Sequence, residues 1–390
     1  MVGWRALGAV AALGLMAAGT AASAQVMIVG NDEKSGYDAN GKSVRNPPGH
    51  DTVSIIDMSN PAKLRIVASL PVPNSIAGPP TNLAVSPTRD IALVANSLKP
   101  DGEGPGYKLV PDDRVFVIDL KASPPAIVGT VTVGEQPSGL AIAPNGKLAL
   151  VCNRHDGTLS VLSINGKEVK VVDTVQVGTG ADSVSAVAIT PDGKRALAVK
   201  SAANKVALLS INGDKVTYDK HDLPVGIFPY NVAITPNGQL ALTADNGNHG
   251  NSDGNVDTVT VIDLSAKHPH VIDHVTVGDS TEGLVISPKG NLAVSIEARG
   301  SNHPKTDWYH RPTGFITVLT IDGKNVMPTS ERIVGALPEG GAFSADGSYL
   351  YIGNFISKDF SVFKVNGDEL TDAGTFKLPG QPASVRAGPQ

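Results

Sequence analysis

The residues best suited to chemistry gather in four long segments of the chain. These segments are Asp32–His50, Ser97–Asp113, Gly247–Val256 and Ala298–Thr313. They carry His50, His249, His303 and His310 with the aromatic residues Tyr107, Trp308 and Tyr309, and His155 lies in a shorter segment of the same kind. Imidazole binds metal ions and transfers protons near neutral pH, and aromatic rings offer apolar contact area to a ligand. We therefore predict a ligand site that includes His155, His303, His310, Trp308 and Tyr309.

A second set of polar residues stands at the ends of strand-like runs, at equivalent points of a repeated pattern. The set is Asn31, Asn96, Asn153, Lys200, Asp245, Glu297 and Asn354. If the repeats superpose, these side chains form a polar ring that binds a ligand. Glu282 and Glu339 then join Glu297 and Asp245 in an acidic quadrant opposite Lys200. The alternative is that asparagine at a strand end caps the following turn, which suits the asparagines better than Lys200, Asp245 or Glu297.

Two classes of function follow from these residues. In the first, Glu297, Asp245 and Glu282 hold a divalent cation, Ca²⁺ or Mg²⁺, through oxygen ligands. Water held by the metal or activated by a carboxylate then hydrolyses a small lactone or ester. Glu297 or Glu282 is the general base, and Lys200 or Arg311 stabilises the oxyanion. In the second class, the surface is non-catalytic and recognises a small polar molecule or a periplasmic protein through its aromatic residues.

The elements that must position these residues are short strands arranged in repeats. One unit begins at Pro137, continues through the turn Pro144-Asn145-Gly146 and ends at Gly178. It contains four strand-like runs, and the Asn-Gly pair fits a type I′ turn. The glycines that close successive units are Gly134, Gly178, Gly226, Gly278, Gly335 and Gly380, at spacings of 44, 48, 52, 57 and 45 by subtraction. This spacing is typical of four-stranded propeller blades.

Six complete units are visible, and the two ends of the chain supply the seventh. The segment 26–72 provides three strands, and Pro382–Arg386 matches the missing innermost strand in position and pattern. Pairing the two segments closes the ring and removes an exposed strand edge. We therefore predict an all-β, seven-bladed propeller of four-stranded blades, in a single domain over residues 25–390. A β-solenoid is the alternative, but it needs no such divided unit.

The units 137–178 and 229–278 resemble the YVTN-type β-propeller repeat, which is also found in lactonase-like propellers. The resemblance rests on the opening proline, the Pro-Asp-Gly-like turn and the Val-Ile-Asp sequence at 261–263, and it extends over essentially the whole chain after residue 24. It implies the propeller fold and makes lactone hydrolysis plausible by analogy. Similar repeats occur in enzymes, binding proteins and surface proteins, so the fold alone does not define the activity.

The N-terminal residues and the composition suggest where the protein works. Arg5, the apolar run 6–19 and Ala22-Ser23-Ala24 predict a signal peptide over residues 1–24 and a periplasmic or secreted protein without membrane insertion. Removing Arg5 leaves 31 basic residues against 37 acidic ones, a charge of about −6, so we expect no nucleic-acid partner. Cys152 is the sole cysteine, and its apolar setting predicts a small buried side chain.

Overall fold

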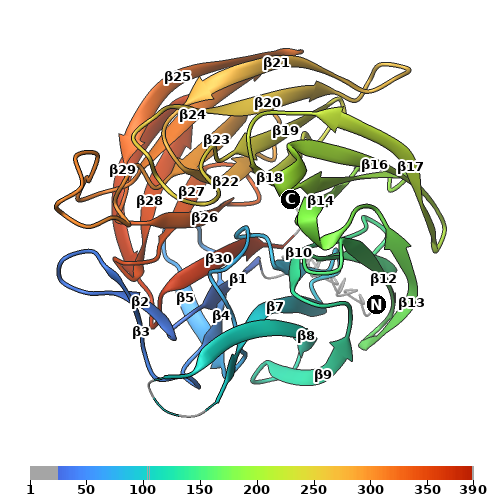
Figure 1. Ribbon diagram of the computed structural model, residues 1–390, viewed down its shortest axis with the longest axis horizontal. Helices are drawn as coiled ribbons and strands as arrows, with labels where there is room; N and C mark the ends of the chain where they lie inside the picture. The colour runs from blue at the N-terminus through green and yellow to red at the C-terminus, as the bar shows by residue number, and fades with distance from the viewer. Residues whose placement is uncertain (1–24, 103, 105, 389–390) are drawn as a thin grey trace, which may run out of the picture.

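The computed structural model describes residues 25–388, except residues 103 and 105, as a ring of seven antiparallel four-stranded sheets (Figure 1). This confirms the predicted seven-bladed propeller. The predicted signal peptide lies outside the described residues. Within them, no helix has the length and apolar character needed to cross a bilayer. The helical turns are η1 (Gly180–Asp182) and η2 (Ser201–Ala203).

Blades 1 to 6 follow one another along the chain, each running from an innermost to an outermost strand. Blade 1 contains β6 (Leu83–Val85), β7 (Ile91–Asp101), β8 (Lys108–Asp119) and β9 (Ala126–Thr132). Blade 2 contains β10 (Pro137–Ile142), β11 (Leu148–Asn153), β12 (Thr158–Asn165) and β13 (Glu168–Gln176). Blade 3 contains β14 (Val184–Ile189), β15 (Arg195–Lys200), β16 (Lys205–Asn212) and β17 (Lys215–Pro224).

The next three blades repeat this order and carry two of the long loops. Blade 4 contains β18 (Pro229–Ile234), β19 (Leu240–Asp245), β20 (Asp257–Asp263) and β21 (His270–Val277). Blade 5 contains β22 (Thr281–Ile286), β23 (Leu292–Glu297), β24 (Phe315–Asp322) and β25 (Asn325–Ile333). Blade 6 contains β26 (Pro338–Phe343), β27 (Tyr349–Asn354), β28 (Asp359–Asn366) and β29 (Glu369–Lys377).

Blade 7 joins the two ends of the described chain, as predicted. Its strands are β30 (Pro382–Ala387), β1 (Val26–Asn31), β4 (Thr52–Asp57) and β5 (Arg65–Leu70). Met27 pairs with Ala387 and Val29 with Val385, and Figure 1 shows the red β30 beside the blue β1. Because β30 covers the inner edge of β1, that edge is not left unpaired, and blade 7 has four strands like the other blades.

The turns between first and second strands differ from the predicted type I′. Gly146 has a φ of +69°, but Asn145 is not among the residues with positive φ, whereas type I′ needs positive φ at both central residues. The Gly146 amide donates to the Ala143 carbonyl at 2.8 Å, which makes Pro144 and Asn145 the central residues. Proline at the first central position favours type I, so Pro144 decides the turn type and glycine takes the left-handed position after it.

The core lies between neighbouring blades, where their apolar faces pack together. Between blades 2 and 3, for example, Leu150 and Cys152 of β11 belong to one buried cluster with Val187 and Ala198 of blade 3. Cys152 is fully buried, and burial raises the pKa of its thiol, so the predicted buried role is confirmed. Each second strand is enclosed within its sheet and between blades, which makes the ends of these strands rigid positions.

Candidate functional site

The four long loops lie in contact on one face of the ring. Loop 32–50 includes a small hairpin of β2 (Ser35–Tyr37) and β3 (Ser43–Arg45). The loops are joined by hydrogen bonds from Lys305 N to Asn40 O at 3.1 Å, from Tyr107 Oη to Asn46 O at 2.9 Å and from Gly300 N to Ser252 Oγ at 2.7 Å. We call this surface the loop face. Its loops support one another, so together they can shape a site on the rigid scaffold beneath.

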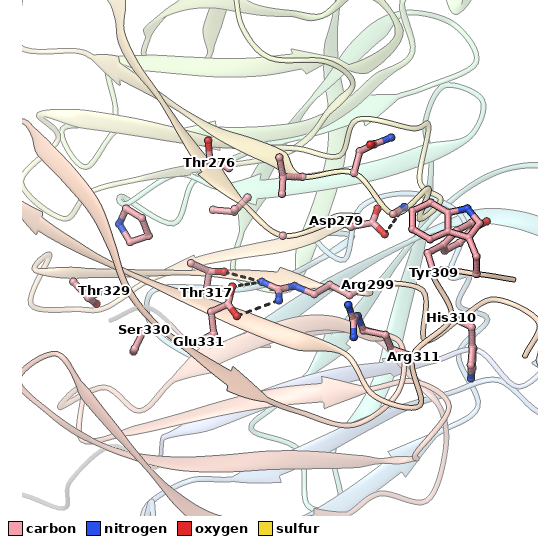
Figure 2. Close-up of a pocket in the computed structure, with 17 residues that line it drawn as sticks. Thr276, Asp279, Arg299, Tyr309, His310, Arg311, Thr317, Thr329, Ser330 and Glu331 are labelled. Carbon is pink, nitrogen blue, oxygen red and sulfur yellow. Dashed lines mark hydrogen bonds and ion pairs between the residues drawn. The ribbon is translucent and has the colours of Figure 1, made fainter.

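A cavity of about 600 Å³ opens in the loop face between blades 4 and 5 (Figure 2). We call it the rim pocket. Loop segments 254–256 and 308–311 form one side, and the end of β21 with parts of β24 and β25 forms the other. Trp308 lines the pocket with 81 % of its surface exposed. The volume lies within the range of small-molecule sites in proteins, and the exposed indole offers a flat apolar surface to a ligand.

Two arginines line the rim pocket in different electrostatic settings. Arg299 Nε donates to Glu297 Oε2 at 2.7 Å, and its Nη1 donates to Glu331 Oε2 at 3.2 Å. Figure 2 shows Arg299 reaching between Thr317 and Glu331. Arg311 is exposed and forms no hydrogen bond or ion pair with the described part of the chain. Arg311 therefore keeps its donors available for an anionic group, whereas the charge of Arg299 is balanced.

Carboxyl groups with raised pKa values stand beside the same pocket. Asp279 lines it and accepts hydrogen bonds from the amides of Asp253 at 3.1 Å and Gly254 at 3.0 Å. Burial raises the pKa of Asp279 despite these donors. Burial, together with repulsion from Asp279 and Asp253, raises the pKa of Asp257 to about 7. A fixed carboxylate with increased basicity is suited to accept a proton from water.

Of the four residues of the predicted acidic quadrant, Glu282 and Glu339 lie within electrostatic reach of each other at the inner end of the loop face. They are the second residues of β22 and β26, the innermost strands of adjoining blades, and are only 4 % and 3 % exposed. Burial raises the pKa of Glu282 to about 8, although Ser280 and Asn246 donate hydrogen bonds to it. Burial, then repulsion from Glu282, raises the pKa of Glu339 as well. We call these two residues the central carboxyl pair.

Two tyrosines, Tyr37 and Tyr230, lie within electrostatic reach of the buried central carboxyl pair. Tyr37 of the small hairpin packs with Leu337 and Phe355 in a buried cluster, and burial and both glutamates raise its pKa. The Tyr230 Oη accepts a hydrogen bond from the amide of Gly78, in the segment between β5 and β6, at 3.1 Å. The pair therefore lies beneath a closed surface, in contrast to the open rim pocket.

The seven strand-end residues occupy equivalent positions in the second strands. All are buried, and each is engaged within its own blade or by its own loop. Asn153 donates hydrogen bonds to Thr158 and Ser160 of the third strand, and Asn31 and Asn354 donate in the same way within their own blades. Asn96 donates a hydrogen bond to Asp112. Asp245 accepts hydrogen bonds from Thr258 and Thr260. The innermost strand separates second-strand side chains from the channel, because side chains point to the two faces of a sheet. Their assignment to ligand binding stays a prediction.

The glycines that end the blades explain why polar side chains lie buried at the ends of the second strands. A Cβ on Gly226 would lie 2.4 Å from the Asp245 carboxylate, and one on Gly335 would lie 2.5 Å from the Asn354 amide carbon. The Gly335 amide donates to Asn354 Oδ1 at 3.0 Å. The polar side chain at one strand end thus packs on the glycine that ends the preceding blade. This contact gives the repeated polar position a structural role at the joint between blades.

The predicted catalytic and cation-binding residues occupy separate surroundings. Lys200 in blade 3 pairs with Asp222 at 2.9 Å, whereas Glu297 lies in blade 5 against Arg299. Burial raises the pKa of Glu297 in spite of this arginine. Neither Glu297 nor Asp245 nor Glu282 belongs to a group of converging metal ligands among the described residues. The three therefore do not fit a shared Ca²⁺ or Mg²⁺ ion in this arrangement, and no cation enters the chemistry derived below.

The predicted histidines and aromatics divide between two places. His303 Nδ1 lies 3.1 Å from Asp307 and 3.0 Å from Tyr309 Oη, and His310 Nδ1 lies 3.0 Å from the His303 carbonyl. These contacts order the 298–313 loop behind Trp308. His155 lies in blade 2, outside the rim pocket.

Sequence reasoning missed three residues beside the rim pocket, Arg299, Asp257 and Asp279. Arg299 follows Glu297 by two positions, and Asp257 ends an Asn- and Gly-rich loop. Those positions were visible in the sequence, but their convergence depends on how blades 4 and 5 meet. A buried lysine, Lys34, was missed as well; its Nζ lies 2.9 Å from Asp51 Oδ2.

Known structures share this fold at low sequence identity. A candidate 6-phosphogluconolactonase from Bacteroides uniformis is 16 % identical, with a TM-score of 0.69, covering 94 % of this chain and 99 % of that one. The periplasmic gluconolactonase of Pseudomonas aeruginosa is 17 % identical, with a TM-score of 0.67 and coverage of 94 % and 99 %. Hydrazine synthase of Kuenenia stuttgartiensis is 19 % identical, with a TM-score of 0.60 and coverage of 80 % and 90 %.

These similarities show the propeller fold, which supports unrelated activities. The sequence matches no protein-family model and no curated protein. The likeness to a candidate 6-phosphogluconolactonase and to a gluconolactonase is therefore one of fold.

Proposed function

We propose that this protein is an exported hydrolase that opens a small lactone or ester in the rim pocket. The observation that carries the proposal is the combination of groups around one open cavity of about 600 Å³: an unpaired guanidinium, an exposed indole and a fixed carboxyl of raised pKa. These groups belong to Arg311, Trp308 and Asp279. The likeness in fold to a candidate 6-phosphogluconolactonase and to a gluconolactonase supports the choice of a lactone.

Each group has a defined part in the proposed reaction. The Asp279 carboxylate takes a proton from water as the water oxygen bonds to the lactone carbonyl carbon. Arg311 donates hydrogen bonds to the oxyanion of the resulting tetrahedral intermediate. The ring C–O bond then breaks, and the proton on Asp279 passes to the leaving alkoxide, giving a hydroxy acid. Trp308 packs against the ring of the substrate and holds it in the pocket.

The test is a pH-indicator assay with a series of aldonolactones. We expect turnover by the native protein, with kcat lowered about 100-fold in Asp279→Asn and in Arg311→Ala. The matched control is Arg65→Ala, which removes an exposed arginine from blade 7 and should leave kcat unchanged. Absence of turnover by the native protein, or unchanged kcat in both pocket variants, would overturn the proposal.

A second function is favoured by the exposure of Trp308. An indole with 81 % of its surface exposed is suited to anchor a small molecule or a periplasmic protein without catalysis. Quenching of Trp308 fluorescence by an aldonolactone that is not hydrolysed would support recognition alone.

Export rests on the leader pattern of residues 1–24. It predicts a mature protein that begins at Gln25, which mass spectrometry of periplasmic extracts would test.

A further inference from the structure

A cluster of three metal-ligating side chains lies in blade 2, apart from the rim pocket. Glu135 follows β9, and His155 and Asp156 follow β11. His155 Nδ1 lies 2.8 Å from Glu135 Oε2 and 3.7 Å from Asp156 Oδ1. One ligand atom of each residue falls within 4.8 Å of the others, and no other such group of three occurs among the described residues.

The separations between these atoms suit a small divalent ion. Zn²⁺ binds imidazole nitrogen and carboxylate oxygen at about 2.0–2.2 Å in a tetrahedron, which places neighbouring ligand atoms about 3.3 Å apart. The observed distances of 2.8 and 3.7 Å lie on either side of this value. The side chains of His155, Glu135 and Asp156 are 59 %, 58 % and 35 % exposed. An ion can therefore enter from solvent, and a fourth position stays open to water.

The backbone holds the three residues in place. The His155 amide donates to the Glu135 carbonyl at 3.3 Å, and the Arg154 amide donates to the Gln136 carbonyl at 3.0 Å. The Glu135 amide donates to Asp156 Oδ2 at 2.7 Å, which directs this carboxylate toward the cluster. Binding an ion then requires only side-chain rotations, so little ordering opposes it.

Blade 6 contains the same loop pair without the ligands. The Ile356 amide donates to the Ala336 carbonyl at 3.2 Å, and the Phe355 amide donates to the Leu337 carbonyl at 2.8 Å. The Ala336 amide donates to Ser357 Oγ at 3.0 Å, where blade 2 uses Asp156. Alanine, isoleucine and serine therefore suffice to build this structure. The fold does not require glutamate, histidine and aspartate at the blade 2 positions.

We propose that Glu135, His155 and Asp156 form a binding site for a first-row divalent cation, with Zn²⁺ as the best fit. One imidazole with two carboxylates is a donor set that such ions accept, and water completes the coordination. The site is independent of lactone hydrolysis, because none of its ligands lines the rim pocket.

The test uses blade 6 as the template for the control. Protein treated with a chelator is dialysed against Zn²⁺ and the bound metal is quantified, for the native chain and for the triple variant E135A/H155I/D156S. We expect one Zn²⁺ per native chain with a micromolar Kd, at least a 30-fold weaker Kd in the triple variant, and a zinc-dependent rise in Tm only in the native chain. His268→Ala, a histidine outside the cluster, should retain the ion.

Each alternative outcome has a defined meaning. Without zinc, the triple variant should have the native Tm, because its side chains are those of an existing loop pair. Equal zinc affinity in the native and triple-variant proteins would overturn the proposal, and so would the absence of bound zinc in native protein at 100-fold the expected Kd. Lactone turnover does not enter these readouts, so failure of one proposal leaves the other intact.

Discussion

The central carboxyl pair and the rim pocket lie on the same face of the ring but differ in access and charge. Glu282 and Glu339 are almost fully buried, whereas the rim pocket is open and presents Arg311 to solvent. These two carboxyls, with strongly raised pKa values, are thus closed off from solvent. Their raised pKa values come from burial first, and burial also raises the pKa of structural groups. Access, more than pKa alone, separates the catalytic candidate from the structural one.

The largest expected effect tests the burial of the central carboxyl pair. The pKa of Glu282 rises from 4.5 to about 8 on folding, so the folded state holds a proton that the unfolded state releases between these values. Stability must therefore fall as pH rises from about 4.5 to 8. Glu282→Gln keeps the shape but not the charge, and should stabilise the protein by about 5 kcal/mol at pH 9, with little effect at pH 4.

Denaturant unfolding of both proteins across pH 4–9 measures this difference. Asp214→Asn, which alters an exposed turn residue, should leave the pH profile native. A Glu282→Gln profile that still falls between pH 5 and 8 by the native amount would show that this carboxyl does not cause the loss.

The next largest expected effect is a difference in stability between the alanine variants of the two arginines that line the rim pocket. Arg299→Ala leaves Glu297 buried without its cation, which should cost about 3 kcal/mol of unfolding free energy at pH 7. Arg311→Ala removes an exposed, unpaired side chain and should change stability by less than about 0.5 kcal/mol. Thermal and denaturant unfolding would measure both. Equal stability losses in the two variants would remove the distinction between a structural and a ligand-binding arginine.

The smallest expected effect concerns Trp308. Because 81 % of this side chain is exposed, Trp308→Ala should leave Tm unchanged while weakening ligand binding in the rim pocket about 10-fold. Titration calorimetry with a slowly hydrolysed lactone analogue would measure the change in Kd. Undiminished affinity would place the ligand elsewhere on the loop face.

Trp4 lies within the predicted signal peptide, so Trp308 fluorescence reports on this pocket alone in the mature chain.

The fold was predictable because its signals are local and repeated. Each of blades 1 to 6 carries its own turn and closing glycine, and Pro382–Arg386 matched the one missing strand. The turn type was predicted wrongly because the Asn-Gly pair was weighed without Pro144, which fixes the first central φ. The pairing of Glu282 with Glu339 also followed from the repeat, since both residues occupy the same position of adjoining innermost strands.

The site was less predictable because side-chain direction and loop contacts are not local properties. Glu297 ends its strand where expected, but it turns to Arg299 and away from the channel. The rim pocket depends on segments far apart in the chain, such as 254–256 and 328–331, meeting across two blades. Its Arg311 and Trp308 were predicted from residue type, whereas Asp279 gains its role only from the packing around it.

Because β30 joins β1, blade 7 can be completed only after a strand far along the chain has been made. β1 begins at Val26, yet its inner neighbour β30 begins only at Pro382, and the Gly388 amide donates to the Val26 carbonyl at 2.7 Å. Until then β1 exposes an unpaired edge. Cutting the chain after residue 381 would leave that edge permanently open, whereas linking residue 388 to residue 25 and opening the turn at Gly166 should preserve every sheet. The point at which two distant segments close the ring can therefore be moved from blade 7 to another blade.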